Sequence, residues 1–355
     1  SPISIITKND SHYKGIRVMF RFIAPICALM CITPLQASIA ENLNIYTHRQ
    51  PALLEPILEA YTKKTGTTFS TVYAPKGLVQ RLQSEGDATP ADMVITVDIN
   101  RVHELSETGL LASLSSTKIK NQVPAHLRDK SDKWTALSLR ARIAAVSVQR
   151  VKKSEVSSLS DLTKSDLKGR VCTRVGSHVY NRALLASIIA NDGENAAREW
   201  AKGLVVNLAR KPQGNDRAQA KAIYSGECDV ALMNTYYYGK MKFNEKDPEQ
   251  KKWADSLRLV FLDQNGRGQH VNISAAAILK ASKKQGAALE FIEWLTSPEA
   301  QLLYTEVNYE YPVNPGVNPS EEVASWGKFK MDRVSLTDIA KNTPLAQMII
   351  NETGW

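Results

Sequence analysis

Apolar and polar positions along the chain alternate between two periods. Short β-prone runs are separated by segments in which apolar residues recur at helical spacing. Strands are expected at 43–46, 67–73 and 91–96, and helices at 53–65, 78–84 and 102–108. Gly66 and Gly109 stand where the first and third of these helices should end. Strands that alternate with helices in this way predict a parallel sheet with helical crossovers.

A longer run at 134–148 has no helical crossover beside it, and its core at 142–148 predicts a long strand that passes from one lobe to the other. A second β-prone run at 271–279 is a candidate for the return crossing. Between them lies a second α/β set, which begins with the segment 159–167 and has helices at 181–191, 194–204 and 216–225 and strands at 170–174, 205–208 and 229–233. Helices at 285–295 and 298–306 follow the return.

This order predicts two α/β lobes with a ligand cleft between them, since binding sites favour such interfaces and closure is a hinge motion. The first lobe would contain residues 41–139 and 275–355, and the second would contain residues 140–274.

The first 40 residues have a different pattern, which is typical of a cleaved secretory signal peptide. Basic residues precede a short apolar run and then small residues: Lys14, Arg17 and Arg21, then 22–35, then Ser38 and Ala40. We expect cleavage before Glu41, with residues 1–18 as an upstream extension if Met19 is the initiator. A lipid anchor at Cys31 is a weaker alternative, because Met30 is not the small residue that should precede it. The run is too short and broken for a membrane span.

Charge and cysteine content narrow the class of protein further. The net charge is +9, but the basic residues are scattered and alternate with acidic ones, which argues against a nucleic-acid-binding protein. After cleavage only Cys172 and Cys228 remain, and two cysteines in an exported chain can pair. We expect a disulfide between them; two buried thiols are the alternative.

The candidate chemistry lies in the segment Asn-Thr-Tyr-Tyr-Tyr-Gly at 234–239, directly after the apolar run 230–233. A ligand crevice forms outside the carboxyl ends of strands in open α/β sheets, although aromatic residues that cap a helix start are the alternative. A phenol has a pKa of about 10, so it ionises at neutral pH only beside a strong positive charge. Oxygen donors suit hard ions, so paired tyrosines without a Cys or His cluster indicate ferric iron.

Five motifs together resemble a known family, the periplasmic ferric-ion-binding proteins that deliver iron to ABC importers. They are the segments 44–51 (Asn-Ile-Tyr-Thr-His-Arg-Gln-Pro), 176–181 (Gly-Ser-His-Val-Tyr-Asn), 226–238, 297–301 and 309–313. The resemblance covers essentially the whole mature chain. It implies the type II periplasmic-binding-protein fold, with two α/β lobes joined by two hinge strands.

The resemblance also implies the ligands. Tyr236 and Tyr237 match the family's phenolate pair and Tyr180 matches a third phenolate found in some members, whereas Tyr238 is expected to pack. Three phenolates balance the charge of one Fe3+ ion. The chain departs from the family at the first strand, where Gln50 and Pro51 replace a histidine, or a histidine and a tyrosine, of some relatives. Tyr46 and His48 are further candidates there, with local hydrogen bonding as the alternative for each.

Family members often add a synergistic anion such as carbonate or bicarbonate. Arg142 matches the anion-binding arginine better than Arg140 does, with an ordinary salt bridge as the alternative for either, and a guanidinium suits a planar oxyanion. His178 and Asn181 are expected to orient Tyr180. The implied partner is an inner-membrane ABC permease with its ATPase, and the mature protein would be a soluble periplasmic monomer.

Two other functions remain open at this point. The same fold could bind an organic or oxyanion ligand such as a polyamine, a phosphonate or thiamine. An iron-dependent enzyme is disfavoured, because the six histidines show no i, i+4 pair and no Cys-His spacing that would supply metal ligands and a general acid or base.

Overall fold

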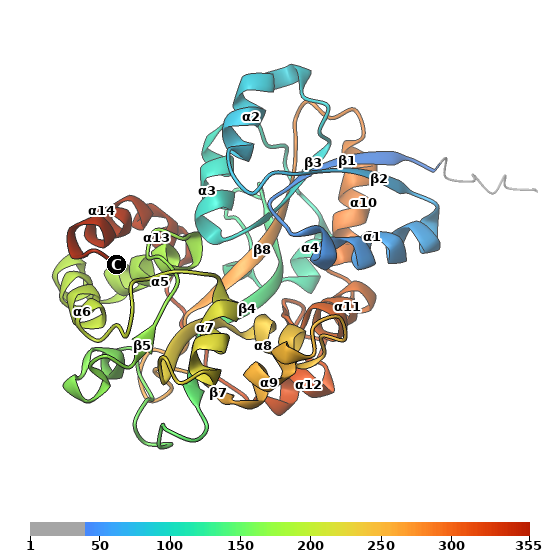
Figure 1. The fold of residues 1–355 in the computed structure, drawn as a ribbon. Coiled ribbons are helices and arrows are strands. Elements are labelled where there is room, and N and C mark those ends of the chain that lie inside the picture. The colour runs from blue at the N-terminus through green and yellow to red at the C-terminus, as the bar shows by residue number, and fades with distance from the viewer. Residues whose placement is uncertain (1–39) are drawn as a thin grey trace, which may run out of the picture. The chain divides into compact units, whose positions relative to one another are not determined.

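The computed structural model describes residues 40–355, coloured in Figure 1. The predicted signal peptide, its cleavage-proximal residues and Cys31 therefore lie outside the described residues, apart from Ala40. Among the described residues, none of the helices has the length and apolar character needed to cross a membrane.

The first lobe is built on parallel strands with helical crossovers, as the alternating pattern predicts. Its elements are β1 (Asn42–Thr47), α1 (Pro51–Thr65), β2 (Thr68–Tyr73), α2 (Leu78–Glu85), the 3-10 turn Gly86–Ala88, β3 (Met93–Val97), α3 (Ile99–Glu107), α4 (Thr117–Gln122) and the 3-10 turn Ala125–Leu127. Strand β1 pairs in parallel with β2 and β3. Helix α1 begins with Pro51, whose missing N–H costs nothing there, and ends at Gly66 in the left-handed conformation.

A long strand passes from the first lobe into the second. All 13 residues of β4 (Thr135–Ser147) are buried. Its first half pairs with β8 (Val271–Ile278), which in turn pairs with β3, and its second half pairs with β6 and β7. The sheet order β2-β1-β3-β8-β4-β6-β5 therefore runs through both lobes, and Figure 1 shows β4 and β8 between them.

The second lobe repeats the strand and helix alternation with less regularity. Its elements are the 3-10 turns Ser160–Thr163 and Ser165–Leu167, β5 (Val171–Cys172), α5 (Val179–Asp192), α6 (Glu194–Val206), α7 (Asp216–Tyr224), β6 (Val230–Asn234), α8 (Thr235–Lys242), α9 (Glu249–Asp255) and β7 (Leu257–Val260). The disulfide expected between Cys172 and Cys228 is confirmed, with the two Cα atoms 5.9 Å apart. It ties β5 to the residues that enter β6.

One sequence-based prediction in this lobe is wrong, and the segment 159–167, whose type the sequence left open, forms two separate 3-10 turns. The strand expected at 205–208 is absent from the described structure, because α6 continues to Val206 and only Leu208 forms a bridge, to Val171. Apolar runs of four residues at a helix end do not distinguish a strand from a last helical turn.

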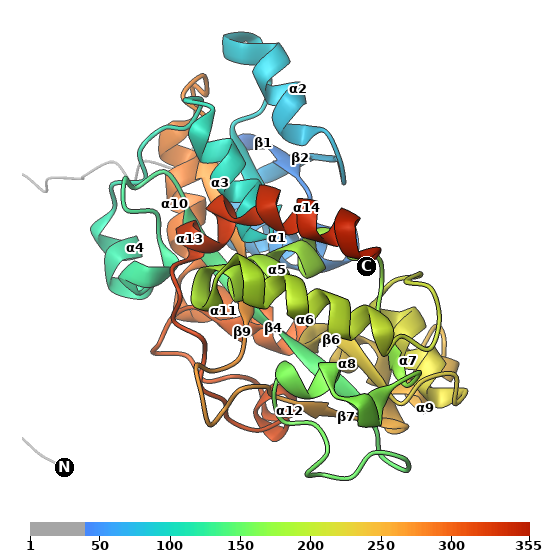
Figure 2. The same cartoon turned by 90° about the vertical axis from the view of Figure 1, so that its left-hand side faces the viewer.

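The C-terminal part divides between the lobes. It consists of α10 (Gln285–Leu295), α11 (Pro298–Asn308), β9 (Tyr311–Pro312), α12 (Glu321–Ser325), α13 (Leu336–Lys341) and α14 (Thr343–Thr353). Helices α10 and α11 pack against β8 and α1, whereas α14 packs on α5 and α6 (Figures 1 and 2). The indole of Trp355 donates to Thr173 Oγ1 at 2.8 Å. The sequence-based division placed all of 275–355 in the first lobe, and its last helix packs instead on the second.

Candidate metal centre

Two of the three consecutive tyrosines lie in the first turn of a helix. Strand β6 ends at Asn234 and α8 begins at Thr235, so Tyr236 and Tyr237 stand directly after the carboxyl end of a buried strand. Both are buried, and their rings stack with centroids 4.4 Å apart. Tyr238 instead packs edge-on against Trp326.

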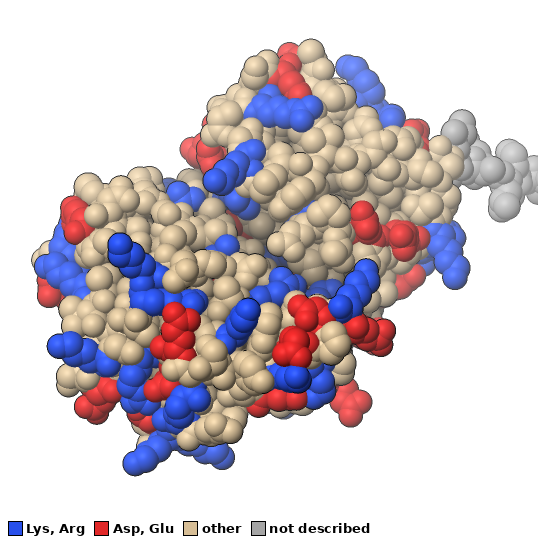
Figure 3. Space-filling model, viewed as in Figure 1, with Lys and Arg blue, Asp and Glu red and all other residues tan. Residues whose placement is uncertain are grey.

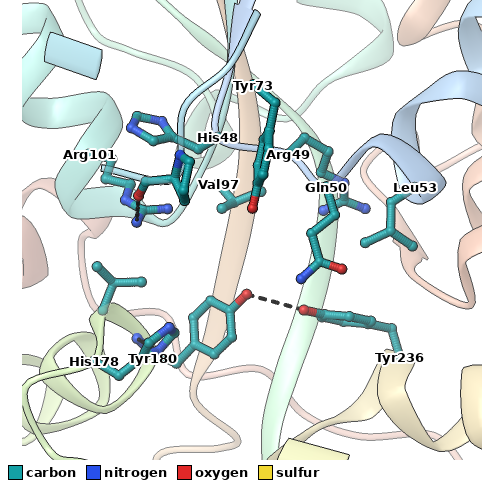
Figure 4. A pocket seen from close by; sticks show the side chains of 12 residues that line it. His48, Arg49, Gln50, Leu53, Tyr73, Val97, Arg101, His178, Tyr180 and Tyr236 are labelled. Atoms are coloured by element: carbon teal, nitrogen blue, oxygen red, sulfur yellow. Dashed lines mark hydrogen bonds between the residues drawn. The ribbon is translucent and has the colours of Figure 1, made fainter. Parts of the chain in front are cut away.

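A third tyrosine reaches the same place from another helix. Tyr180 lies in the first turn of α5, and its hydroxyl is 3.2 Å from the hydroxyl of Tyr236 (Figure 4). His178 caps this helix, because its Nδ1 accepts a hydrogen bond from the Tyr180 N–H at 3.3 Å. The His178 ring also packs edge-on against the Tyr180 ring at 4.4 Å. The structure thus brings together the three tyrosines that the sequence singled out, and His178 holds one of them.

The Tyr180 and Tyr236 hydroxyls face a cavity of about 100 Å³ between the two lobes. Second-lobe residues on its wall are His178, Val179, Tyr180 and Tyr236; first-lobe residues are His48, Arg49, Gln50, Leu53, Tyr73, Pro75, Val97 and Arg101 (Figure 4). Tyr237 lies behind Tyr236 and is not part of the wall. In the space-filling view a hollow separates the lobes, and charged side chains of both signs are scattered over the face shown (Figure 3).

The environment raises the pKa of all three phenols above the ordinary value. For Tyr236 the main cause is burial, followed by the neighbouring Tyr237. For Tyr180 it is burial and then Tyr236, and for Tyr237 burial and then Tyr180. Each phenol destabilises a negative charge on the next, so without a cation all three are protonated at neutral pH.

Arginines supply positive charge beside these rings. The Arg142 guanidinium is 5.6 Å from the Tyr180 ring centroid, and that of Arg140 is 5.8 Å from the Tyr236 centroid. Arg142 donates from Nε to Asn181 Oδ1 at 2.9 Å and from Nη1 to Asp216 Oδ2 at 3.1 Å. Its Nη2 is buried and has no partner among the described residues. Arg142 therefore keeps one donor for a further acceptor.

Arg140 has other partners, and its Nε, like Nη2 of Arg142, is buried without a partner among the described residues. It donates to the carbonyl of Ile273 at 3.1 Å and to Glu310 Oε2 at 3.2 Å. Glu310 also pairs with Arg49, so one buried carboxylate lies between two buried guanidinium groups.

Asn181 does not act on Tyr180 in the way expected. Its amide nitrogen donates to the carbonyls of Arg174 and Val175 at 3.0 and 3.1 Å, and its oxygen accepts from Arg142. Asn181 therefore positions the arginine and the loop before α5.

The two first-lobe candidates differ in position. The Tyr46 hydroxyl donates to Glu85 Oε1 at 3.0 Å, and the Arg81 guanidinium lies 4.7 Å from its ring centroid, away from the cavity wall. His48 lines the cavity, with Nδ1 2.8 Å from Thr96 Oγ1. Burial, and then the charge of Arg101, lower the pKa of His48 to about 3, so its imidazole is neutral.

Sequence reasoning missed three residues of the cavity wall: Arg49, Tyr73 and Arg101. All three follow the carboxyl ends of first-lobe strands or close such a strand, which is the same signal that identified Tyr236. Across residues 40–355, no group of three or more His, Cys, Asp or Glu side chains could hold a metal ion. The phenols are therefore the distinctive donors of the cleft.

Comparisons with known proteins agree with this geometry. Residues 57–331 match the family model of bacterial extracellular solute-binding proteins. Iron uptake protein A1 of Synechocystis is 38% identical over 89% of this chain and 88% of its own length. The apo ferric ion-binding protein A of Pasteurella haemolytica has a TM-score of 0.84 and 42% identity, covering 89% of this chain and 98% of that chain.

A Trichodesmium protein solved in complex with iron and citrate ligands is 38% identical, with a TM-score of 0.83 over 88% of this chain and 99% of that chain. The two-lobe mixed α/β fold predicted from the sequence is confirmed by these matches. Their coverage extends over both lobes and both helices that carry the clustered tyrosines. The chain belongs to the bacterial extracellular solute-binding proteins, which are not enzymes, and within them to the family of ferric-ion-binding proteins of ABC uptake systems.

Proposed function

We propose that this protein binds ferric iron in the interlobe cleft through the phenolates of Tyr180, Tyr236 and Tyr237. The observation that supports this most directly is the meeting of three phenols from α5 and α8, with two hydroxyls 3.2 Å apart. Tyr236 and Tyr237 are buried and Tyr180 is half-buried, and gathering phenols that raise one another's pKa has no evident structural benefit. A trivalent hard cation reverses the effect, because it stabilises the phenolate forms and balances three negative charges.

A synergistic anion completes the proposal. Three phenolates leave coordination positions open on the ion, and the unpartnered Nη2 of Arg142 supplies a buried donor near Tyr180. Carbonate or bicarbonate fits, because a guanidinium matches planar oxyanions.

The cavity at the phenols has room for an ion with a small anion. Pockets for drug-sized organic molecules measure roughly 300–1,000 Å³, whereas this cavity is about 100 Å³. A neighbouring hollow of about 500 Å³ shares His48, Pro75, Arg101, His178 and Val179 with its wall. The donor set of three phenols, rather than the volume, therefore favours iron over thiamine or a polyamine.

We place the mature protein in the periplasm, where it would deliver iron to an inner-membrane ABC permease and its ATPase. Reduction to ferrous iron or loss of the anion would release the metal, since a less charged ion stabilises phenolate less.

A visible absorption titration with ferric nitrilotriacetate tests the assignment, because ferric phenolates absorb in the visible range. We expect a coloured complex that saturates at one iron per chain and forms more tightly with bicarbonate. Tyr236→Phe or Tyr237→Phe should weaken iron binding more than about 100-fold, since even residues that merely support a ligand contribute 10–100-fold to metal affinity.

Tyr224→Phe is the matched control, because this tyrosine is exposed at the end of α7, outside the cleft. Its iron binding should equal that of the wild type. Near-normal binding by both cleft variants would refute the phenolate site, and no colour in the wild type would direct the search to organic ligands.

A further inference from the structure

The three clustered phenols all belong to the second lobe, so the proposed site is one-sided. Tyr180 comes from α5, and Tyr236 and Tyr237 come from α8. An ion held by one lobe alone would not by itself draw the other lobe onto it. A donor on the first-lobe wall would join the lobes through the metal.

The first-lobe wall contains few side chains that can bind a hard cation. Arg49 and Arg101 are cations, and Leu53, Pro75 and Val97 have no donor atom on the side chain. Gln50 supplies only a neutral amide oxygen, and His48 supplies an imidazole, which suits softer ions. Tyr73 is the wall residue from this lobe that carries a phenol oxygen, the same donor type that is gathered on the second lobe.

The backbone around Tyr73 is held in place by hydrogen bonds. It is the last residue of β2, in register with Thr47 of β1, and the next residue is fixed by a 2.9 Å hydrogen bond from the Ala74 N–H to the Thr47 carbonyl. Arg101 holds the same segment by donating to the Pro75 carbonyl at 2.9 Å. The backbone is therefore fixed while the side chain is 42% exposed.

The Tyr73 hydroxyl is directed into the cavity. Figure 4 shows its ring extending from the first lobe, with the hydroxyl aimed toward the side where Tyr180 and Gln50 project. Among the described residues this hydroxyl has no hydrogen-bond partner. Tyr46, by contrast, is already bonded to Glu85. Tyr73 is thus free where Tyr46 is not.

The charge balance around the cavity permits one more phenolate. Four phenolates on Fe3+ would leave one net negative charge, and a bound bicarbonate would add another. Arg101 lines the same cavity, and Arg49 and Arg140, which share the carboxylate of Glu310, carry one further net positive charge beside it. Nearby positive charge favours the ionised form of a phenol, so the excess negative charge has counter-ions on both lobes.

We propose that Tyr73 is a first-lobe ligand of the metal, binding through its phenolate when the lobes close over an ion held by Tyr180, Tyr236 and Tyr237. In this step the Tyr73 O–H releases its proton to solvent and its oxygen bonds to iron. A water molecule or an anion oxygen leaves that coordination position. The proposal rests on the ferric-iron function proposed above, and it identifies the residue that fulfils the role left open by Gln50 and Pro51.

The test compares the wild type, Tyr73→Phe and Tyr224→Phe, because the two tyrosines have similar exposure, 42% and 46%. Each protein is loaded with ferric nitrilotriacetate, its visible band is recorded, and iron removal by excess citrate is timed. Phe keeps the ring, so the fold is preserved. We expect Tyr73→Phe to bind one iron with an altered band and to lose it at least several-fold faster, while Tyr224→Phe matches the wild type.

An identical band and removal rate in Tyr73→Phe and the wild type, with both proteins loaded, would overturn the Tyr73 proposal and leave the three-phenolate site intact. Failure of the proposed function would look different, because the wild type itself would then show no coloured complex.

Discussion

Each of the clustered phenols must lose a proton before it can bind iron as a phenolate. Burial and the neighbouring phenols raise the pKa of Tyr180, Tyr236 and Tyr237 above the ordinary value, so the metal-free site is neutral near pH 7. In the proposed site, iron binding would therefore release protons, and acid would compete with the metal. A fall in pH should therefore weaken iron binding by protonating the phenolates, even if the lobes do not move.

This gives a prediction for the pH dependence of affinity. Below the raised pKa values, each displaced proton makes the affinity increase roughly tenfold per pH unit. The slope of log affinity against pH should therefore be at least three in the wild type and one unit smaller in Tyr180→Phe. Competition titrations between pH 6 and 8, against a chelator whose own pH dependence is known, measure it. Tyr224→Phe should keep the full slope, and an equal slope in Tyr180→Phe would mean that Tyr180 stays protonated.

For single residues, the sequence indicates which residue types stand at strand ends, but it says less about the direction in which each side chain points. Tyr236 was predictable because it follows a buried strand, and the Gly-Ser-His-Val-Tyr-Asn motif identified Tyr180. The hydrogen bonds of Tyr46 to Glu85 and of Asn181 to Arg142 were not predictable, since each depends on a partner at least 39 residues away. Tyr73 carried the same strand-end signal as Tyr236 but lacked a motif.

At the scale of elements, a buried carboxylate at the start of α7 holds the second lobe together beneath the phenols. Asp216 accepts from Arg142 at 3.1 Å, from Arg174 at 3.3 Å and from the Asn234 N–H at 2.8 Å, and so connects α7, β4 and β6. Burial alone raises the pKa of this carboxyl, but the two guanidinium charges hold it below the ordinary value. The charges of Asp216, Arg142 and Arg174 are therefore balanced only while all three residues are present.

Asp216→Asn tests this connection. The change keeps the shape but leaves two buried guanidinium groups without a counter-charge, and breaking a buried ion pair costs about 3 kcal/mol or more. We expect the free energy of unfolding, measured by urea denaturation, to fall by about that amount. Glu199→Gln removes an exposed pair with Lys202 and should change nothing measurable. Equal midpoints for Asp216→Asn and the wild type would show that the network is not stabilising.

Element type was largely predictable, and the misses have physical reasons. Long segments such as α1, with its helical period, and β4, with its apolar run at 143–146, have one reasonable interpretation. The segment 205–208 does not, because its apolar residues fit a strand or the end of α6 equally well. Asn207, directly after α6, donates to the carbonyls of Leu162 and Lys164 at 2.8 and 2.7 Å, and the sequence does not show these contacts.

At the scale of the whole molecule, the two lobes share one sheet, and the side chains that line the cavity come from both lobes. The phenols project from the second lobe, and Arg49, Arg101 and Tyr73 face them from the first. The pairing of β4 with strands of both lobes makes this element the natural hinge. The assignment of 275–355 to one lobe could not anticipate that α14 packs on α5 and α6, since that contact depends on where the chain returns after β9.

Iron should therefore change the shape of the whole molecule. One ion bound by donors from both lobes stabilises the closed form by its differential affinity for that form, and this shifts the population. We expect the radius of gyration from small-angle X-ray scattering to fall when the mature protein is loaded with iron. The protein with Tyr180, Tyr236 and Tyr237 all changed to Phe should show no such fall under the same conditions. Tyr73→Phe separates binding from closure, because it should retain iron and compact less than the wild type. A loaded wild type that keeps its metal-free radius would place all ligands on the second lobe and leave the hinge without a role in capture.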